Sequence, residues 1–447
     1  MVENWIKVRD DHMPLKFVKE NDEANKEVTF RLSDELNTNW CQNSTFSITD
    51  LRGRVEPWLT SLFQSEHLSL LVGSGLTTAI QYEATNNTSN AMGLPSLKTT
   101  YKDKVNTAVK ESIKNTGRGE ENIEDYFRVI NDLLRGLEIL QQVEEYTTLK
   151  NELNDILYEF TESISTIENN IAIAENDQRK SAFNKLVMFL MSFASRTGTR
   201  DRLNIFTTNY DRLIEAGAEL AGLHLLDRFV GILAPIFRSS RLDLDMHYNP
   251  PGIRGEPRYL EGVARFTKLH GSIDWVESGG DIRKIGIPFG ATDFRPYLSA
   301  PGLSADATNI MIYPNSSKDR ETAEYPYVEL FRDLAAALCR PNSTLVTYGY
   351  SFGDEHINRI IRDMLTIPST HLVIISFDDK SERIMRNYTE MGRTTQISLL
   401  IGADVASIEP LTNYFLPKPS IDKNTIRMAE LLKQRYEQPT KPYEEDN

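Results

Sequence analysis

Strand patterns and helix patterns alternate over the last third of the chain, and this alternation constrains the fold most strongly. Apolar runs of strand length are each followed by an amphipathic segment of helix length. The pairs are 343–348 with 355–365, 371–377 with 381–391, and 396–401 with 406–415. Strands that alternate with helices in this way build a parallel sheet covered by helices on both faces. The sequence therefore predicts an α/β fold with a doubly wound, Rossmann-like parallel sheet.

Three further strand patterns upstream end in residues that suit a ligand site. Residues 67–76 form a mostly apolar run that ends in glycines, residues 204–208 precede Asn209, and residues 267–269 precede His270. In open α/β sheets, ligands bind outside the carboxyl ends of the strands, near the point where the strand order reverses. We therefore expect the loops after these three strands to lie close together and to form the functional site.

Between the first and second of these strands the pattern is helical. Apolar residues recur every three or four positions in 123–137, 149–164 and 182–193, and no proline interrupts 96–234. Because proline breaks helix interiors, its absence favours long helices, and we expect an inserted helical bundle. A coiled coil is the alternative, but no heptad is sustained. The polar residues 81–90 predict a loop before this insertion.

These patterns divide the chain into four parts. We predict an N-terminal extension at 1–60, which packs on the core or on a partner subunit, and a Rossmann-like domain at 61–100 and 201–416. The helical insertion occupies 101–200, and a polar C-terminal tail occupies 417–447. The extension itself contains a short strand pattern at 27–32 and a helix pattern at 52–64.

Composition argues against several classes of function. The net charge of −14 disfavours direct nucleic-acid binding, because an acidic surface repels phosphate backbones. The sequence contains no apolar run of roughly 18 residues, so we expect no membrane span. Residues 1–7 lack the apolar core of a secretion signal. The two cysteines, Cys41 and Cys339, lie too far apart for a disulfide framework or a zinc module. We expect a cytoplasmic protein without a bound metal.

The turn Gly73-Ser74-Gly75 is the first candidate site. A strand that turns sharply into a helix needs glycine where the backbone has positive φ or approaches a ligand closely. The N–H groups of the following helix can bind a pyrophosphate, with Thr77 and Thr78 as possible capping residues. Thr78 stands where the dehydrogenase fingerprint has its third glycine, which disfavours ordinary hydride transfer. The alternative is a plain strand-to-helix turn without a ligand.

The segment Thr208-Asn209-Tyr210-Asp211 is the second candidate. At a strand end, Asn209 can orient a ribose hydroxyl or a water, and Asp211 can accept a hydrogen bond from a ribose or hold the loop. The alternative is that Asn209 and Asp211 merely cap the helix that starts near Arg212, which is a common use of both residue types.

His270 is the candidate general base, because it follows a strand directly and a neutral imidazole can accept a proton. Gly349 and Ser351 follow a later strand, where glycine allows close approach and the hydroxyl can bond a phosphate or ribose. The alternative there is again a plain turn, with Asp354 as the helix cap. His356 opens that helix, and we interpret it as structural.

Three of these segments, taken in their order along the chain, resemble the nicotinamide-dinucleotide site of the sirtuin family. The family's Gly-Ala-Gly turn corresponds to Gly73-Ser74-Gly75, its Gln-Asn-Ile-Asp to Thr208-Asn209-Tyr210-Asp211, and its catalytic histidine with glycine to His270-Gly271. The resemblance spans about residues 67–415. It implies that His270 and Asn209 act on the nicotinamide ribose and that Gly73, Ser74, Gly75, Thr77, Thr208, Asp211, Gly349 and Ser351 line the cofactor pocket.

Departures from the family pattern point to one of its branches. Residues 275–310 contain no cysteine, where deacetylating sirtuins carry a four-cysteine zinc module. Gly93-Leu94-Pro95-Ser96 is similar to the family's cofactor loop but lacks the Asp-Phe-Arg that follows in those enzymes, and Thr208 replaces a glutamine. Each departure disfavours deacetylation. The chain is more similar to the bacterial sirtuins that degrade NAD in antiviral defence.

This resemblance implies an NAD glycohydrolase that releases nicotinamide and ADP-ribose and causes abortive infection by depleting NAD. It also implies a homo-oligomer, and the layout is most similar to the sirtuin partner of HerA-type ATPases. NAD is the expected substrate, with no metal, no membrane and no direct nucleic-acid partner. Two alternatives remain open: an NAD-dependent protein deacylase, and a non-catalytic NAD or ADP-ribose sensor.

Overall fold

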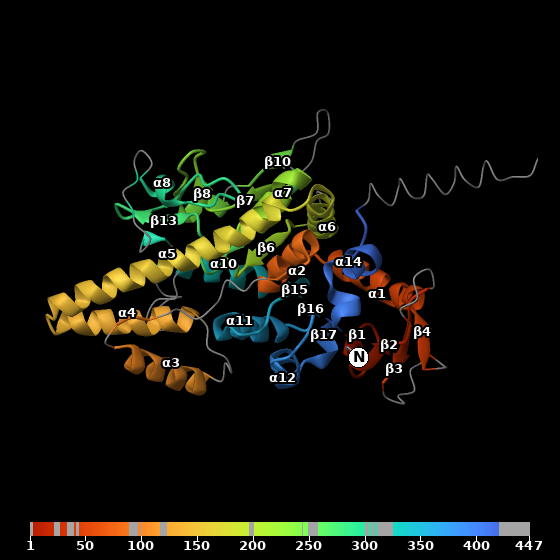
Figure 1. Cartoon of the computed structure of the whole chain (residues 1–447). Coiled ribbons are helices and arrows are strands. Elements are labelled where there is room, and N and C mark those ends of the chain that lie inside the picture. The colour runs from red at the N-terminus through yellow and green to blue at the C-terminus, as the bar shows by residue number, and fades with distance from the viewer. Residues whose placement is uncertain are drawn as a thin grey trace, which may run out of the picture.

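The computed structural model describes most of the chain. The described residues are 3–21, 27–33, 40–41, 44–88, 97–99, 101–116, 123–195, 201–243, 245–248, 258–299, 303, 305, 309–310 and 325–419. They form one large mixed sheet with helices on both faces, from which a pair of long helices projects (Figure 1).

Seven neighbouring strands of this sheet run parallel and make up its centre. In spatial order they are β17 (Ile397–Ile401), β16 (His371–Ser376), β15 (Ser343–Tyr348), β5 (His67–Val72), β6 (Asn204–Thr207), β12 (Val263–Lys268) and β7 (His224–Leu226). Without the edge strand β7, the order read from β12 to β17 is 3-2-1-4-5-6, that of a doubly wound nucleotide-binding sheet. The predicted fold class is confirmed, and the strand order reverses between β5 and β15.

The N-terminal residues extend this sheet at its β17 edge. β1 pairs antiparallel with β17, and three more antiparallel strands follow outward. They are β1 (Glu3–Lys7), β2 (Leu15–Lys19), β3 (Thr29–Leu32) and β4 (Thr45–Ser47). The strand predicted at 27–32 and the helix predicted at 52–64 are thus confirmed, the helix as α1 (Ile48–Phe63). The extension packs on the core by continuing the sheet.

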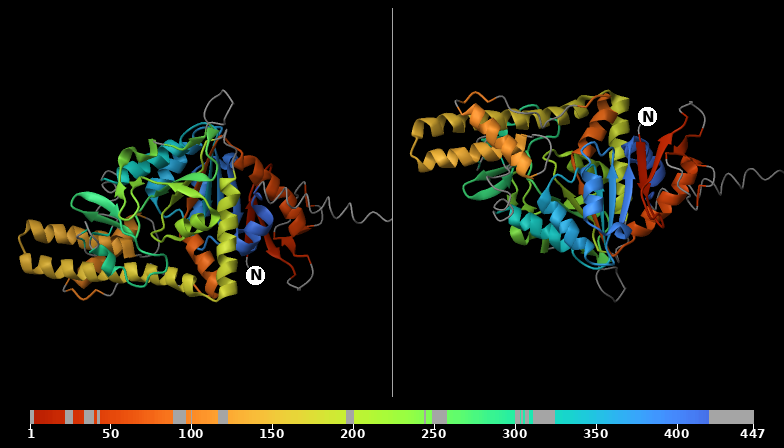
Figure 2. Two further views of the ribbon diagram at one scale, coloured as in Figure 1. Left: turned by 90° about the horizontal axis from the view of Figure 1, so that it is seen from above. Right: turned by 90° about the horizontal axis from the view of Figure 1, so that it is seen from below.

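Alternating side chains of the parallel strands enter two separate cores, one on each face, as the pleat of a strand requires. Leu70 and Val72 point into the first core and Leu71 into the second. The first face is covered by α1, α2 (Ser74–Thr85), α6 (Asn176–Ala194) and α7 (Leu213–Ala221). The second is covered by α10 (Tyr327–Leu338), α11 (Glu355–Leu365) and α12 (Arg383–Glu390), as the two views of Figure 2 also show.

The inserted helices confirm the helical prediction for the segment between β5 and β6. They are α3 (Lys102–Thr116), α4 (Ile123–Ile139), α5 (Val143–Ile173) and α6. The helices α4 and α5 lie side by side and extend away from the sheet (Figures 1 and 2). Together with α3 they share a core with apolar residues of 273–310, whereas α6 packs on α2 and belongs to the core of the sheet. The proposed domain boundaries stay predictions.

A small antiparallel sheet lies beside β12, in the turn-rich part of the chain. Its strands, in spatial order, are β13 (Trp275–Ser278), β14 (Asp281–Lys284), β9 (Ile236–Phe237) and β8 (Phe229–Val230). The remaining elements are short: η1 (Ser239–Asp243), β10 (His247–Tyr248), β11 (Arg258–Tyr259), α8 (Arg295–Leu298), η3 (Thr394–Gln396), α13 (Ala403–Ala406), α14 (Ile408–Pro410) and η4 (Leu411–Phe415).

Two local predictions are wrong. The loop predicted at 81–90 begins too early, because α2 continues to Thr85 with Gln81 and Ala84 buried, and ends at Asn86 in the left-handed conformation. The single helix predicted at 406–415 is instead a series of short pieces, α13, α14 and the π-helix η4.

The predicted tail from 420 onward lies outside the described residues. Within the described part, none of the helices has the length and apolar character needed to cross a membrane.

Candidate active site at the carboxyl edge of the sheet

The strand register brings four loops to the same height at the carboxyl edge of the sheet. Tyr348, Val72, Thr207 and Lys268 form one row across β15, β5, β6 and β12. Two residues beyond this row come Tyr350, Asn209 and His270, each in the loop after its strand, and Ser74, the first residue of α2. The three upstream segments singled out by the sequence therefore end side by side, at the place where the strand order reverses.

The glycines of the β5 and β15 turns pack directly against each other. The Gly73 N–H donates to the Tyr348 carbonyl at 3.0 Å, and the Gly75 N–H donates to the Gly349 carbonyl at 3.1 Å. A Cβ on Gly75 would lie 2.6 Å from the Gly349 Cα, and Gly349 has a φ of +59°. These glycines are thus required by backbone packing. The N–H groups of Gly73 and Gly75 already have partners, so a phosphate would have to use other donors of this turn.

This packing gives a stability prediction. Gly349→Ala should lower the free energy of unfolding more than Gly392→Ala, because both glycines have positive φ but a Cβ at 392 would meet only open space. The control should lose roughly 1–2 kcal/mol for the left-handed backbone. Gly349→Ala should lose about 1–3 kcal/mol more for the overlap. Urea unfolding measures both, and equal losses would show that the turns do not need this contact.

Asn209 is anchored through its amide nitrogen. The Nδ2 group donates to the Gly73 carbonyl at 3.0 Å and to the Thr77 hydroxyl at 3.1 Å, and the side chain is 8% exposed. A carbonyl can only accept, so the nitrogen must face Gly73, and the oxygen points the other way. No donor among the described residues reaches that oxygen. Asn209 therefore has a fixed orientation and an acceptor to offer to a ligand or a water.

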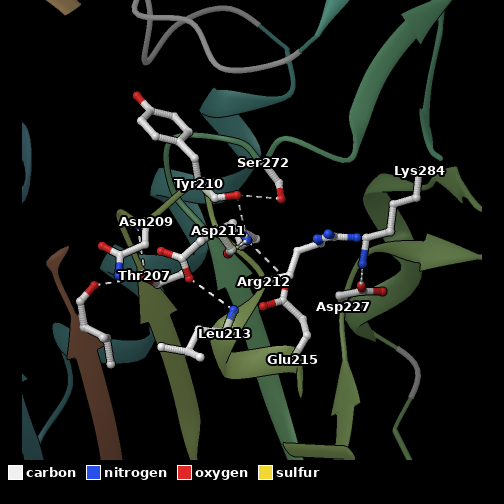
Figure 3. A network of polar contacts seen from close by, with 12 residues as sticks. Thr207, Asn209, Tyr210, Asp211, Arg212, Leu213, Glu215, Asp227, Ser272 and Lys284 are labelled. Carbon is white, nitrogen blue, oxygen red and sulfur yellow. Dashed lines mark hydrogen bonds and ion pairs between the residues drawn. The ribbon is translucent and has the colours of Figure 1, made fainter. Parts of the chain in front are cut away.

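Thr77 and Asp211 complete a chain of hydrogen bonds with Asn209. The Thr77 hydroxyl donates to Oδ2 of Asp211 at 2.6 Å. Oδ1 of Asp211 accepts from the Leu213 N–H at 3.0 Å (Figure 3). Asp211 thus bonds the first residue of α7, although Arg212 occupies the cap position there, and it also ties the start of α7 to α2. The prediction that Thr77 and Thr78 cap α2 is wrong, because the cap position is Gly73 and the Thr78 hydroxyl donates to the Ser74 carbonyl.

His270 pairs with the carboxylate of Asp354, a residue that the sequence predicted only as a helix cap. Its Nε2 lies 2.9 Å from Oδ2 of Asp354, and the two side chains are 21% and 12% exposed. The other oxygen of Asp354 accepts from the backbone N–H groups of His356 and Ile357 and so caps α11, as predicted. Because a carboxylate accepts, the neutral imidazole is expected to carry its proton on Nε2, and Nδ1 is then its basic nitrogen.

The inserted helices contact the Asn209 loop through Tyr210 and Arg212. The Tyr210 hydroxyl donates to Glu124 of α4 at 2.7 Å, and the Tyr210 ring lies 6.3 Å from the His270 ring. Glu168 of α5 accepts from the Arg212 N–H at 2.7 Å and forms a buried ion pair with its guanidinium. Burial raises the pKa of Glu168, and Arg212 opposes that rise. The insertion is therefore connected to the loop that carries Asn209.

A large open cleft adjoins these residues on the side of β15, β16 and β17. Its volume is about 1160 Å³, and the predicted residues Ser74, Gly75, Gly349 and Ser351 line it. Asn209 and His270 lie outside this lining, but Asn209 bonds the Gly73 carbonyl at the cleft's edge. The other predicted cofactor residue, Thr208, uses its N–H to bond the Val72 carbonyl at 3.2 Å. The segment Gly93–Ser96 lies outside the described residues.

The cleft also contains acidic and aromatic residues that the sequence did not single out. They include Tyr82 of α2, Phe377 and Asp378 after β16, and Asp404 after β17. In the sequence, the only indication of a role for these residues was their position, either after a strand or on the helix that follows the glycine turn. Among the described residues, no group of three or more His, Cys, Asp or Glu side chains gathers closely enough to hold a metal ion.

Comparison of the sequence with known protein families gives a match over part of the chain. Residues 203–395 match the SIR2-like domain. The matched range contains Asn209, His270, Gly349 and Ser351, and it begins after the glycine turn at 73–75. A comparison with curated protein sequences finds no significant match. Residues 203–395 are thus similar to a SIR2-like domain, and such a domain fits a role in binding or processing NAD.

Proposed function

We propose that this protein is an NAD glycohydrolase, which cleaves NAD to nicotinamide and ADP-ribose. The observation that carries the proposal is the position of Asn209 and His270 at the same height after adjacent strands, with Asn209 bonded to Gly73 at the edge of a cleft large enough for a dinucleotide. One side chain offers a fixed acceptor, and the other offers a basic nitrogen, Nδ1, on an imidazole whose Nε2 is held by a carboxylate. This combination suits the positioning and deprotonation of a water or a ribose hydroxyl.

In the proposed reaction, the bond between the nicotinamide nitrogen and the ribosyl C1′ breaks, and the bonding electrons leave with nicotinamide. The sugar passes through an oxocarbenium-like state. A water that donates to the Asn209 oxygen attacks C1′, and Nδ1 of His270 accepts the proton, either from this water or through a ribose hydroxyl. Asp354 holds the imidazole in the required tautomer and stabilises its protonated form.

The rest of the dinucleotide is proposed to occupy the cleft. The start of α2 offers the backbone N–H of Ser74 and the positive end of a helix dipole to the pyrophosphate. Ser351 is placed to bond a phosphate or a ribose hydroxyl. Asp378, which lies after β16, can accept from the adenosine ribose, as acidic residues at strand ends do in dinucleotide sites. These contacts hold the substrate while the chemistry takes place at its other end.

The biological setting is proposed from the family resemblance. NAD depletion is toxic, so the activity would suit anti-phage defence by abortive infection in the cytoplasm. It would require control, for which we propose assembly into a homo-oligomer and a HerA-type ATPase partner. The N-terminal extension and the helical insertion are the candidate assembly surfaces.

The decisive experiment is incubation of the purified protein with NAD, alone and with a candidate ATPase, with and without an acyl-lysine peptide, followed by chromatography of the products. We expect nicotinamide and ADP-ribose without peptide. Nicotinamide release that requires the peptide would instead identify a deacylase. Binding of NAD or ADP-ribose without any product under all conditions would identify a sensor, and either result overturns the proposal.

A further inference from the structure

A buried lysine lies directly beneath the Asn209 and His270 loops. Lys268 is the last residue of β12, two positions before His270, and its side chain is 1% exposed. Its Nζ donates to the carbonyls of Tyr210, at 3.4 Å, and Asp211, and to the Glu215 carboxylate of α7 at 3.2 Å. An ammonium has three donors, and all three have acceptors here. Two of these acceptors belong to the loop that carries Asn209.

The same loop is bound from a second direction by the residues after His270. The Tyr210 carbonyl also accepts from the Ser272 hydroxyl at 3.1 Å and from the Ile273 N–H at 3.2 Å. Figure 3 shows this carbonyl turned toward Ser272, while the Tyr210 ring points away from the network. The Asn209 loop and the His270 loop are thus joined on both sides of His270, by Lys268 before it and by Ser272 and Ile273 after it.

The free-energy cost of burying the ammonium indicates that it has a role beyond packing. Removing an ammonium from water costs several kcal/mol, and an apolar side chain of similar volume would avoid that cost. The environment is also charged: burial raises the pKa of Glu215, and the nearby Lys268 opposes that rise. A fully buried charge whose three donors are directed at one loop and at the helix that follows it specifies the geometry of that loop.

We propose that Lys268 is a positioning residue, whose ammonium holds the Tyr210 and Asp211 carbonyls so that Asn209 and His270 keep their relative placement over the substrate. This inference rests on the proposed function for its kinetic readout. Loss of the ammonium should lower kcat by on the order of 10²-fold with little change in KM, because a misplacement of about 1 Å costs that much in rate. Substrate binding in the cleft should be preserved.

The test uses the variant Lys268→Met combined with Glu215→Gln, because Lys268→Met alone would leave a buried carboxylate without its counter-charge. Lys284→Met combined with Asp227→Asn is the matched control. Lys284 and Asp227 form a neighbouring ion pair (Figure 3). Lys284 acts on Glu215 through its charge, but neither residue of the pair bonds the carbonyls of Tyr210 or Asp211. We expect the control pair to keep its kcat and the Lys268 pair to lose it, with unfolding transitions that are cooperative in both. An equal kcat in the two folded double variants would overturn the proposal.

A second readout separates this proposal from the proposed function. Hydrogen exchange of the peptide that covers 208–212 should be faster in the Lys268 pair than in the control pair and the unmodified protein. If the unmodified protein releases no nicotinamide, the proposed function fails, while the exchange comparison still decides the role of Lys268. Unchanged exchange in 208–212 would show that the ammonium does not hold this loop, whatever the activity.

Discussion

His270→Ala should lower the rate of NAD cleavage by roughly 10²–10⁴-fold, the usual contribution of a general base. The variant loses the nitrogen that accepts the proton, but Asp354 keeps its bonds to the start of α11 through its other oxygen. The fold should therefore survive, with a cooperative unfolding transition. Initial rates of nicotinamide release, measured by chromatography over a range of NAD concentrations, give the loss in kcat.

His356→Ala is the matched control for this variant. His356 lies in the first turn of α11, with its ring 6.2 Å from the Phe331 ring, and its backbone N–H bonds Asp354. We expect His356→Ala to keep the activity of the unmodified protein. If His270→Ala and His356→Ala release nicotinamide equally fast, the base must be another residue.

Asn209→Ala should have the second largest effect, a loss of kcat on the order of 10²-fold, because the attacking water would lose its fixed acceptor. The substitution also removes the partner of the Gly73 carbonyl, so we expect a loss of about 1–3 kcal/mol in the free energy of unfolding. The two effects are separated by measuring kcat by chromatography and stability by urea unfolding.

Binding of ADP-ribose provides the control for Asn209→Ala. The cleft residues after β15, β16 and β17 are untouched by this substitution, so calorimetry should give an unchanged Kd. Asn209→Asp makes a finer comparison, since it keeps the shape and an acceptor but loses the two donors that fix the side chain. Full activity of Asn209→Ala with unchanged ADP-ribose binding would remove Asn209 from the mechanism.

Most of the sheet could be predicted because its strands are buried on both faces and read as apolar runs separated by helices. The register of parallel strands then places Asn209 and His270 at one height, so the strand ends predict that these two residues lie near each other. Alternation is a local signal, so it could not show the strand order, which depends on packing between distant segments. It also could not show that the N-terminal strands continue the sheet beyond β17.

The missed residues are those whose partners are far away in the chain. Asp354 lies 84 positions from His270, and its helix-capping role was already sufficient to explain it. Thr77 looked like a cap for α2 but donates to Asp211, 134 positions away. Lys268 stood in the sequence beside His270, yet a lysine at a strand end is ordinarily solvated. Only the folded structure, in which the Asn209 and His270 loops lie over Lys268, shows that this side chain is buried.

The most direct test of the account is the structure of Asn209→Ala with intact NAD bound. The account predicts that the ribose C1′ lies between position 209 and the His270 imidazole, with the adenosine in the cleft beside Ser351 and Asp378. A nicotinamide ribose bound in a region that neither position 209 nor His270 borders would contradict it.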